Sequence, residues 1–419
     1  MDARRSIEAV WRIECPRLIA ALTRLVRDVG LAEELASEAF VAALESWPTE
    51  GIPPRPGGWL MSTARHKAVD RIRREENLRR KYAQLAPVLD RVHVPAEGAL
   101  EAVDDDLLAL LFTACHPVLP RESRVALTLR LLGGLRTEEV ARAFLVPPAT
   151  VGQRISRAKR TLAEAQVPFE KPSREELPER LGAVLEVIYL VFNEGYSPSS
   201  GEVHVRADLA GEAMRLGRVL VGLLPREPEV LGLAALMELQ ASRFAARADA
   251  AGAPVTLEEQ DRRRWDRTLI AHGLGLLDRA AALRKPLGPY TIQAAIAACH
   301  ARAVTFQETD WERIAALYDA LAQLTPSPVV ELNRAVAVLH VDGPGPALEV
   351  LDAVRDDKRL ARYHLVGAVR AEILTGLGRH EEAAAELEGA ADLAPTRHER
   401  ELLRRRMSEA LRRQSAPTA

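Results

Sequence analysis

The sequence predicts an almost entirely α-helical protein. Ala, Leu, Arg and Glu are abundant among the 419 residues, hydrophobic residues make up 47%, and aromatic residues only 4%. The abundant side chains lose little rotamer freedom in a helix, so the composition favours helix over strand. Few stretches alternate apolar and polar residues as strands do. At this length the chain can form two to four domains, each with its own core.

The first block of the chain, residues 4–82, predicts three helices and a proline-rich loop. Apolar residues recur there at helical spacing, and four prolines interrupt the pattern between residues 48 and 56. The expected helices cover residues 6–29, 31–46 and 58–82. Residues 83–103 are poorly periodic and contain Pro87 and Pro95, so a linker is expected there.

Residues 104–166 predict a second small helical unit that ends in a helix-turn-helix. Thr137 is expected to cap a short helix whose first turn carries Glu138 and Glu139, because acidic groups are favourable at the positive end of the helix dipole. A short turn leads to a second helix opened by Pro148, whose missing N–H costs little in the first turn. The spacing is typical of a DNA-binding motif.

The second helix of this motif has one apolar and one polar face. Val151, Ile155 and Leu162 are expected to turn inward. The side chains expected to face outward and contact DNA are Thr150, Gln153, Arg154, Arg157 and Arg160. Arginine forks onto guanine or phosphate and glutamine reads adenine, so this face suits recognition in the major groove. An ordinary solvated basic helix is the alternative.

A second basic segment lies at residues 57–82. Between Arg65 and Lys81 there are eight basic and three acidic residues. Apolar side chains such as Leu60, Ala64 and Ala68 anchor the helix and leave the basic side chains to meet phosphate. Such a cluster gives affinity with little sequence information and a strong salt dependence. A solvated charge run is the alternative, but the helix-turn-helix about 75 residues downstream favours DNA binding.

Charge, cysteine content and hydropathy exclude several classes of protein. The net charge of −2 combines +3 for residues 1–166 with −5 for residues 167–419, so basic charge gathers only locally. The three cysteines have neither a disulfide-framework nor a metal-ligand spacing, so we expect reduced thiols, no metal and no cofactor. No signal peptide and no run of about 18 apolar residues are found, which predicts a cytoplasmic protein that binds no membrane.

Residues 174–411 predict stacked helical hairpins. Small and apolar residues recur there after 36 residues: Ala347, Leu351 and Val354 as Ala383, Leu387 and Ala390, and Val338 as Leu374. The second copy resembles a tetratricopeptide repeat, with Gly378 in its turn and Pro395 at its end. Upstream, an apolar face from Leu177 to Phe192 predicts a further helix, which Gly195 is expected to end.

Together these motifs resemble the extracytoplasmic-function group of the sigma-70 family of RNA polymerase sigma factors. Residues 4–82 look like sigma region 2, and residues 104–166 look like sigma region 4. The resemblance implies that region 2 binds the minus-ten promoter element and region 4 the minus-thirty-five element. The partners that it implies are promoter DNA and core RNA polymerase, through the clamp helices of the beta-prime subunit and the beta flap.

Two segments carry the resemblance to region 2. AEELASEAFVAALESW (residues 32–47) is similar to the family's polymerase-binding helix, and GGWLMSTARHKAVDRIRR (residues 57–74) resembles the strand-opening and minus-ten segment. The polymerase-binding residues that this implies are Glu34, Ser37, Glu38 and Val41, with Phe40 packed inside. The implied DNA-binding residues are Trp59, Arg65, His66, Lys67, Asp70, Arg71, Arg73 and Arg74.

The remaining block resembles the C-terminal extension of a sigma subgroup with a tetratricopeptide-like domain. The segments VIYLVFNEGYSP, GPYTIQAAIAACHA and PSPVVELNRAVAV carry this resemblance. Because two polymerase- and DNA-binding modules share the chain with a large non-basic domain, we expect the extension to modulate activity in cis. Stacked helical repeats create concave surfaces, so the extension is also expected to bind an unknown protein or ligand. Whether it activates or inhibits stays open.

Enzyme activity is not expected, and we assign no catalytic residue. Several polar groups in the extension could converge, but no nucleophile elbow, phosphate loop or metal spacing is present. Helix capping is the expected role of these residues: Asn193, Glu194, Tyr196, His204, Asp261, Asp266 and His300. Trp265, Trp311 and Tyr290 are expected to be core anchors. Two other functions stay open: a conventional repressor or activator with a ligand-binding repeat domain, and a scaffold that has lost DNA binding.

Overall fold

The computed structural model describes residues 3–82, 100–144, 146–196, 206–249 and 253–414. Within these ranges the chain is helical and forms no β-strand, apart from one isolated bridge between Ala248 and Pro254. The all-α prediction is therefore confirmed. The chain divides into two compact units, Met1–Val191 and Phe192–Ala419, which we call unit 1 and unit 2.

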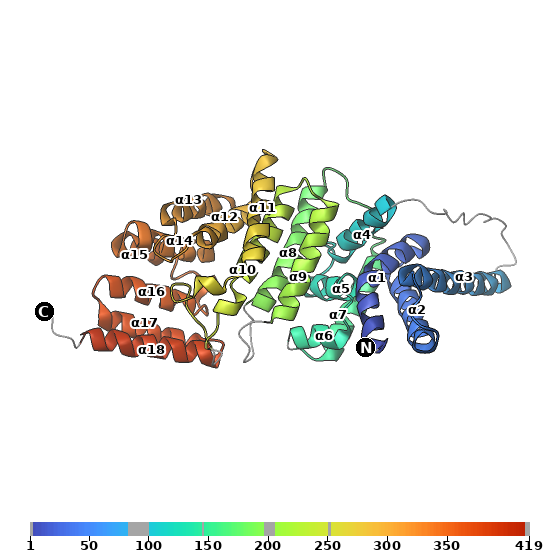
Figure 1. The fold of residues 1–419 in the computed structure, drawn as a ribbon, viewed down its shortest axis with the longest axis horizontal. Helices are drawn as coiled ribbons and strands as arrows, with labels where there is room; N and C mark the ends of the chain where they lie inside the picture. Colours follow the sequence, from blue (N-terminus) through green and yellow to red (C-terminus); the bar gives the residue numbers. More distant parts are fainter. Residues whose placement is uncertain (1–2, 83–99, 145, 197–205, 250–252, 415–419) are drawn as a thin grey trace. The chain divides into compact units, whose positions relative to one another are not determined.

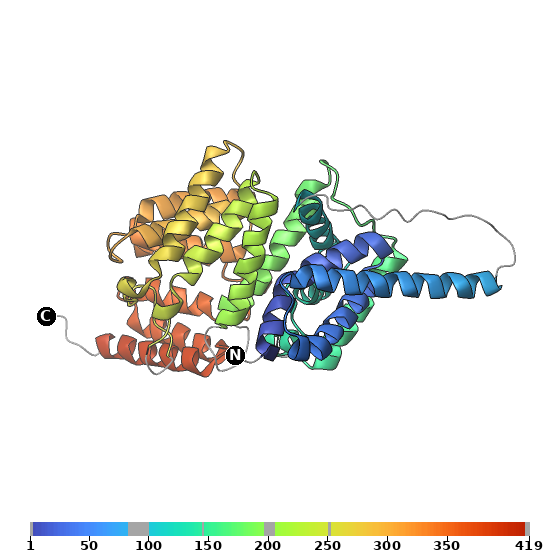
Figure 2. The same cartoon turned by 45° about the vertical axis from the view of Figure 1, so that its right-hand side comes forward.

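Unit 1 holds the helices of the first two predicted blocks. They are α1 (Ala3–Val26), α2 (Val29–Glu50), α3 (Pro56–Tyr82), α4 (Leu100–Ala114), α5 (Arg121–Leu131), α6 (Thr137–Ala143), α7 (Pro148–Glu164) and most of α8 (Leu177–Tyr196). Helix α1 packs against α2, α3 and α4, and α7 packs against α5 and α6. In both views the C-terminal half of α3 projects past α1 and α2 (Figures 1 and 2). Of the expected linker, residues 83–99 lie outside the described residues.

The break between α1 and α2 lies three residues earlier than predicted. Helix α1 ends at Val26, Arg27 adopts a positive φ of 54°, and Asp28 caps α2 by accepting the backbone N–H of Leu31 at 2.8 Å. The sequence interpretation placed the break near Gly30, which instead lies in the first turn of α2. An aspartate cap satisfies an orphan N–H, and this local bond sets the start of α2.

Helix α2 continues through Pro48, where the sequence predicted that the loop begins. It ends only at Glu50, and Gly51 with a φ of 85° donates its N–H to the carbonyl of Trp47 at 2.9 Å. A proline in the last turn removes one helical hydrogen bond. The side chain of Trp47 is 3% exposed and meets Trp59 edge-on at 5.3 Å, so its burial holds the last turn in place.

Unit 2 contains the remaining helices and three short 3-10 turns. They are α9 (Ala207–Leu223), α10 (Pro228–Ala241), η1 (Phe244–Ala246), η2 (Arg262–Arg264), α11 (Arg267–Ala282), α12 (Pro289–Arg302), α13 (Trp311–Leu324), α14 (Pro328–Val341), α15 (Pro344–Asp352), η3 (Lys358–Leu360), α16 (Leu365–Gly376), α17 (His380–Leu393) and α18 (Arg397–Gln414). Helix α10 contacts α9, α11 and α12 and is buried on nearly every side, as expected of a helix that is apolar all round.

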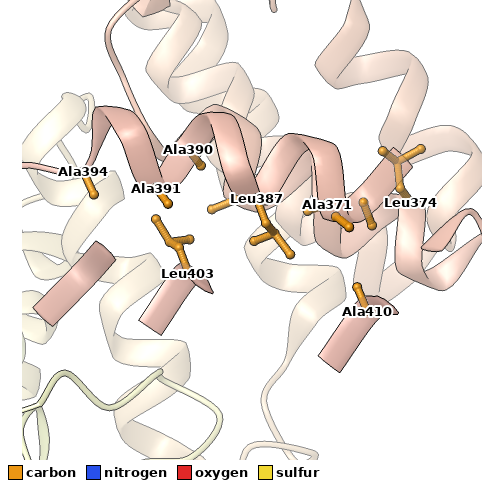
Figure 3. Packing of buried hydrophobic residues seen from close by; sticks show 11 residues of the cluster. Ala371, Leu374, Leu387, Ala390, Ala391, Ala394, Leu403 and Ala410 are labelled. Carbon is orange, nitrogen blue, oxygen red and sulfur yellow. The ribbon is translucent and has the colours of Figure 1, made fainter. Parts of the chain in front are cut away.

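From α12 onward, each helix packs against the next one in the chain, which gives stacked helical hairpins. Both copies of the predicted repeat lie in this stack, one in α14 and α15 and the other in α16 and α17. The repeated positions are buried: Val338, Ala347, Leu351, Leu374, Ala383, Leu387 and Ala390, with Val354 half-buried. Figure 3 shows how Ala391 and Leu387 of α17 pack with Leu403 of α18. The small side chains let the helices approach closely, as the sequence predicted.

Helix α8 ends one residue later than predicted, at Tyr196 rather than at Gly195. A Cβ atom at Gly195 would lie 2.4 Å from the backbone nitrogen of Ala210. Glycine is therefore required here because the start of α9 passes very close to the end of α8. The predicted apolar face of α8 is buried from Leu181 to Phe192.

Candidate nucleic-acid interface

Helices α6 and α7 form the predicted helix-turn-helix, and they pack against each other. The backbone N–H of Arg136 donates to Glu139 Oε2 at 2.7 Å, so Arg136 is the cap residue and α6 begins at Thr137. The prediction that Thr137 caps this helix is wrong by one residue, because the Glu139 carboxylate reaches back to the residue before it. Pro148 opens α7 as predicted, and Leu145 of the connecting turn lies outside the described residues.

Helix α7 has the two faces that the sequence predicted. Val151, Ile155, Ala158 and Leu162 are buried against the rest of unit 1. Of the predicted DNA-contacting side chains, Gln153, Arg157 and Arg160 are exposed, whereas Thr150 and Arg154 are half-buried. No described side chain forms a hydrogen bond or ion pair with the three arginines of this set. Their guanidinium groups are therefore available to a phosphate or a base edge.

Helix α3 presents the second basic surface. Leu60, Ala64 and Ala68 are buried and hold the helix against α1 and α2. Five of the predicted DNA-binding side chains on α3 are exposed: Arg65, His66, Asp70, Arg71 and Arg73. Lys67 and Trp59 are half-buried, and the side chain of Arg74 lies outside the described residues. The contact of Trp59 with Trp47 makes it a packing residue as well as a candidate for DNA contact.

Two ion pairs join the predicted DNA-binding helix to the predicted polymerase-binding helix. Lys67 Nζ of α3 lies 3.3 Å from Glu38 Oε2 of α2, and Arg71 lies 3.2 Å from Glu34. All four side chains are at least 39% exposed. Surface pairs of this kind contribute about 1 kcal/mol or less. They can therefore be exchanged for contacts with DNA phosphate or with a partner protein at little cost.

The outer face of α2 combines charge with an exposed apolar side chain. Glu34 and Glu38 are exposed, Ser37 is half-buried, and Val41 is 52% exposed. Phe40, which was expected to pack inside, is half-buried and stacks on Trp11 with ring centroids 4.5 Å apart. An acidic face with an exposed valine at helical spacing is a surface on which another helix can dock.

A buried ion cluster, which sequence reasoning missed, docks α2 onto α5 and α7. Glu33 is 6% exposed, accepts from Arg130 Nε at 2.5 Å, and pairs with Lys159 Nζ. Burial raises the pKa of Glu33, but Lys159 and Arg130 outweigh it and hold that pKa below the usual value. The available signal was position, because Glu33 follows Val29 by four residues and so falls on the apolar face of α2.

Two further ion pairs join helices from the two predicted blocks. Arg12 of α1 lies 3.1 Å from Glu139 of α6, and Arg24 of α1 lies 2.9 Å from Asp106 of α4. A cavity of about 440 Å³ lies beside the first pair, between α1, α2 and the segment before α6. Its lining includes Trp11, Phe40, Leu44, Gly134 and Arg136. Region-2-like and region-4-like helices are thus docked within unit 1.

The polar residues singled out in the extension lie at several separate places, as far as the structure describes them. Asp261 and Asp266 cap η2 and α11 by accepting backbone N–H groups. Glu194 pairs with Arg206 at 3.4 Å. His204 lies outside the described residues.

Two members of that set, Tyr196 and His300, lie among arginine and aromatic side chains instead. Trp265 is 3% exposed, as expected of a core anchor, whereas Trp311 and Tyr290 are half-buried.

No group of three or more His, Cys, Asp or Glu side chains among the described residues could hold a metal ion. In the same part of the chain, no helix combines the length and the apolar character needed to cross a bilayer.

Family comparisons match three segments of the chain. Residues 13–77 match sigma-70 region 2, residues 109–162 match sigma-70 region 4, and residues 180–281 match a family of unknown function designated DUF6596. The first segment covers α2 and most of α1 and α3, and the second covers the end of α4, all of α5 and α6, and most of α7. Both surfaces described above therefore lie on sigma-70 regions.

Relatives extend the comparison to nearly the whole chain. An uncharacterized protein of Rhizobium meliloti, R00370, is 45% identical over 401 residues, which are 93% of this chain and 92% of that protein. The probable RNA polymerase sigma factor RfaY of Xanthomonas campestris is 32% identical, over 35% of this chain and 37% of its own length. The probable ECF RNA polymerase sigma factor SigI of Mycobacterium tuberculosis is 26% identical, over 40% of this chain and 58% of its own length.

A solved structure of yeast Tom70 aligns with 13% identity and a TM-score of 0.38, over 100% of this chain and 87% of that one. The sigma-70 segments, their order along the chain and the ECF relatives agree with the helices and surfaces of unit 1. The chain belongs to the extracytoplasmic-function group of the sigma-70 family of RNA polymerase sigma factors, and it carries a large C-terminal extension of helical hairpins.

Proposed function

We propose that this protein binds core RNA polymerase, directs it to specific promoters, and is modulated in cis by its C-terminal extension. Region 4 reads the minus-thirty-five element through α7, and region 2 binds the minus-ten element through α3. The observation that carries the proposal is the row of arginines on the outer face of α7, which pair with no described carboxylate and lie on the second helix of a helix-turn-helix. The proteins named as sigma factors among the relatives support the same role.

Polymerase binding is assigned to the outer face of α2. Glu34 and Glu38 offer carboxylates, and Val41 supplies an apolar contact on the same face. The clamp helices of the beta-prime subunit and the beta flap are the proposed contacts on the polymerase. Loss of the Glu38–Lys67 pair on docking makes the Lys67 ammonium available to DNA, and docking also displaces Glu34 from Arg71. Polymerase binding and DNA binding by region 2 are therefore coupled across the α2–α3 contact.

The proposal requires the two sigma regions to separate on a promoter. Minus-ten and minus-thirty-five elements are about 25 base pairs apart, which is roughly 85 Å of duplex at ~3.4 Å per step. A module of about 75 residues has a radius of gyration near ~11 Å. Two such modules held together by Glu33, Arg130 and Lys159 cannot reach both elements. Core polymerase is proposed to provide the surface on which they separate.

A pull-down with purified core polymerase tests the assignment of α2. Glu34→Lys should reduce retention of the full-length protein by at least tenfold, because it replaces a carboxylate by a positive charge that the complementary positive surface of the polymerase would repel. Glu50→Lys, at an exposed position 16 residues after Glu34 and so on a different face of α2, is the matched control and should bind as the wild type does. Failure of the wild-type protein to bind core polymerase would refute the proposal.

DNA footprinting separates a sigma factor from a conventional regulator. We expect protection of a promoter only when core polymerase is present, since the docked state of unit 1 keeps the regions together. Strong protection by the protein alone would identify an ordinary repressor or activator instead. Core binding without any transcription would identify a scaffold.

A further inference from the structure

Unit 2 contains a cluster of arginine and aromatic side chains that lies outside both sigma-70 regions. Its members are Tyr196 at the end of α8, Arg243 and Arg247 beside η1, Arg262 of η2, Trp265, and His300 of α12. These segments are far apart in the sequence, and the fold brings them together. We call this set the arginine–aromatic cluster.

The three guanidinium groups stand against aromatic rings. The Cζ atom of Arg247 lies 3.7 Å from the centroid of the Tyr196 ring. The Cζ atoms of Arg262 and Arg243 lie 5.0 Å and 5.8 Å from the Trp265 ring. Cation–π contacts of this geometry fix the position of an arginine without neutralising its charge. The cluster therefore concentrates positive charge in a partly desolvated place.

Arg262 is a structural member of the cluster. It is 6% exposed, and its guanidinium donates to the carbonyls of His300 and Ala303 at 2.7 Å and 2.9 Å and to Thr309 Oγ1 at 3.1 Å. These neutral acceptors engage both terminal nitrogens of the guanidinium, Nη1 and Nη2. Arg262 thereby ties η2 to the end of α12 and leaves little capacity for a ligand.

Arg243 and Arg247 are different, because most of their donors are unused. Each makes one hydrogen bond, Arg243 to the Tyr196 hydroxyl and Arg247 to the Tyr196 carbonyl. A guanidinium has five N–H groups, so about four remain on each. Neither arginine has a carboxylate within ion-pair distance among the described residues. Two half-buried forks thus lie beside Tyr196, and Glu399 acts on Arg247 only from beyond ion-pair distance.

The surroundings respond to this uncompensated charge. Burial lowers the pKa of His300, and Arg243, Arg262 and His340 lower it further, to about 3, so this imidazole stays neutral. Burial alone would raise the pKa of the Tyr196 phenol, but Arg243 and Arg247 outweigh it and lower that pKa. Both effects indicate a strongly positive site.

The cluster also contains buried polar atoms without a partner. The Nε1 donor of Trp265 and the Nδ1 atom of His300 have no hydrogen-bond partner, although Trp265 is only 3% exposed. Native proteins satisfy nearly all such atoms, so an unsatisfied pair beside free guanidinium donors calls for a ligand or for ordered water. Indole N–H and guanidinium N–H are all donors to oxygen.

We propose that the arginine–aromatic cluster binds the carboxylate or phosphate group of a small anionic ligand, held by Arg243 and Arg247. Forked guanidinium groups match the two oxygens of a carboxylate or phosphate, and the aromatic rings exclude water around the contact. The site lies wholly within unit 2, so the proposal does not depend on promoter binding.

A purely structural role predicts the opposite behaviour in stability. If Arg243 served only to hold Tyr196 in place, Arg243→Gln would destabilise unit 2, because the contacts of the guanidinium with the Tyr196 hydroxyl and the Trp265 ring would be lost. In a binding site, three like charges held close together repel each other in the absence of the ligand. Arg243→Gln should then leave the thermal stability of the ligand-free protein unchanged or higher.

Calorimetric titration of the full-length protein with inorganic phosphate and with citrate, at matched ionic strength in sodium chloride, tests the proposal. The wild type should bind at least one anion saturably, and the anion that binds distinguishes a phosphate from a carboxylate ligand. Arg243→Gln should weaken this binding tenfold or more, as expected for a lost charge-assisted bond. Arg263→Gln, at a 90% exposed arginine paired with Asp261, is the control and should bind normally.

Arg243→Lys provides a second variant if the glutamine variant does not fold. It keeps the charge but loses the fork, so it should also weaken binding. Absence of saturable binding of both anions by the wild type would overturn the proposal. Equal affinity in the wild type and the folded Arg243 variant would overturn it as well.

Discussion

Arg154 differs from the other arginines on the outer face of α7. Its side chain is half-buried, whereas those of Arg157 and Arg160 are exposed. A half-buried guanidinium has fewer rotamers to lose on binding, so it is better placed for a bidentate contact with a base, while the exposed pair suits phosphate. On this helix, Arg154 is therefore the candidate for reading the DNA sequence, and Arg157 and Arg160 are candidates for phosphate contacts that add affinity without sequence preference.

Replacement of Arg154 by alanine should therefore relax promoter specificity at one position. We expect a loss of about 1–3 kcal/mol for the preferred base there and little change for others. Binding of holoenzyme to a promoter library measures this. Arg174→Ala, at an exposed arginine outside α7, is the control. An unchanged base preference in Arg154→Ala would remove this residue from the readout set.

Gly152 lies on the same outer face and fills no steric need. A Cβ atom there would have nothing within 4 Å. Gly152→Ala should stabilise α7 by about 0.5–1 kcal/mol, because alanine loses less backbone entropy in a helix. Hydrogen exchange of α7 amides should slow about two- to fivefold. Gly232→Ala, whose Cβ would lie 2.3 Å from Thr291 Oγ1, should destabilise unit 2 instead.

At the scale of elements, the docking of α2 onto α5 and α7 depends on one carboxylate. Glu33 is buried, while Arg130 and Lys159 are 25% and 21% exposed. Glu33→Gln should weaken this docking by about 3 kcal/mol. This is the lower end of the cost of breaking a buried ion pair, because Arg130 and Lys159 both stay partly exposed to solvent. Faster hydrogen exchange in α2 and α7 would report the loss.

The same contact gives a pH dependence with a defined sign. The folded-state pKa of Glu33 is below its unfolded value of about 4.5, so its contribution is complete above that value and is lost as pH falls through the folded pKa. The difference in protection of the α2 and α7 amides between the wild type and Glu33→Gln should be constant near neutral pH. It should shrink below about pH 4.5. A difference independent of pH down to 3 would contradict this role.

Elements with strong periodicity were predictable, and contacts between distant elements were not. The two faces of α7, the buried face of α8 and the hairpins of α14 to α17 follow from apolar spacing alone. The continuation of α2 through Pro48 depends on the burial of Trp47 against Trp59, which no local pattern encodes. The Glu33 cluster and the arginine–aromatic cluster join residues more than 35 positions apart, so only the fold reveals them.

At the scale of the whole molecule, α8 determines where the extension can be removed. Arg180 of α8 donates to the carbonyl of Phe112 at 2.9 Å, and Glu186 pairs with Arg121 and Arg124. A truncation after residue 166 would strip these contacts from α4 and α5. A truncation after residue 196 keeps them, and it therefore tests the extension without damaging region 4.

The protein truncated after residue 196 should lose promoter-specific transcription by at least tenfold if the extension is required for activity. An equally large increase would establish modulation in cis with the opposite sign. Transcription assays with core polymerase measure either change, and hydrogen exchange of α4 and α5 controls for folding. Activity equal to that of the full-length protein would exclude a role for the extension in cis.

We propose that the two docked helical modules of unit 1 separate on core polymerase and bind a promoter at two places. The most direct test is to map the 5′ ends of RNA made from genomic DNA by core polymerase with the full-length protein. We expect a small, discrete set of start sites that share two upstream elements, and Arg154→Ala should relax only the distal element. Start sites identical to those of core polymerase alone would contradict the proposal.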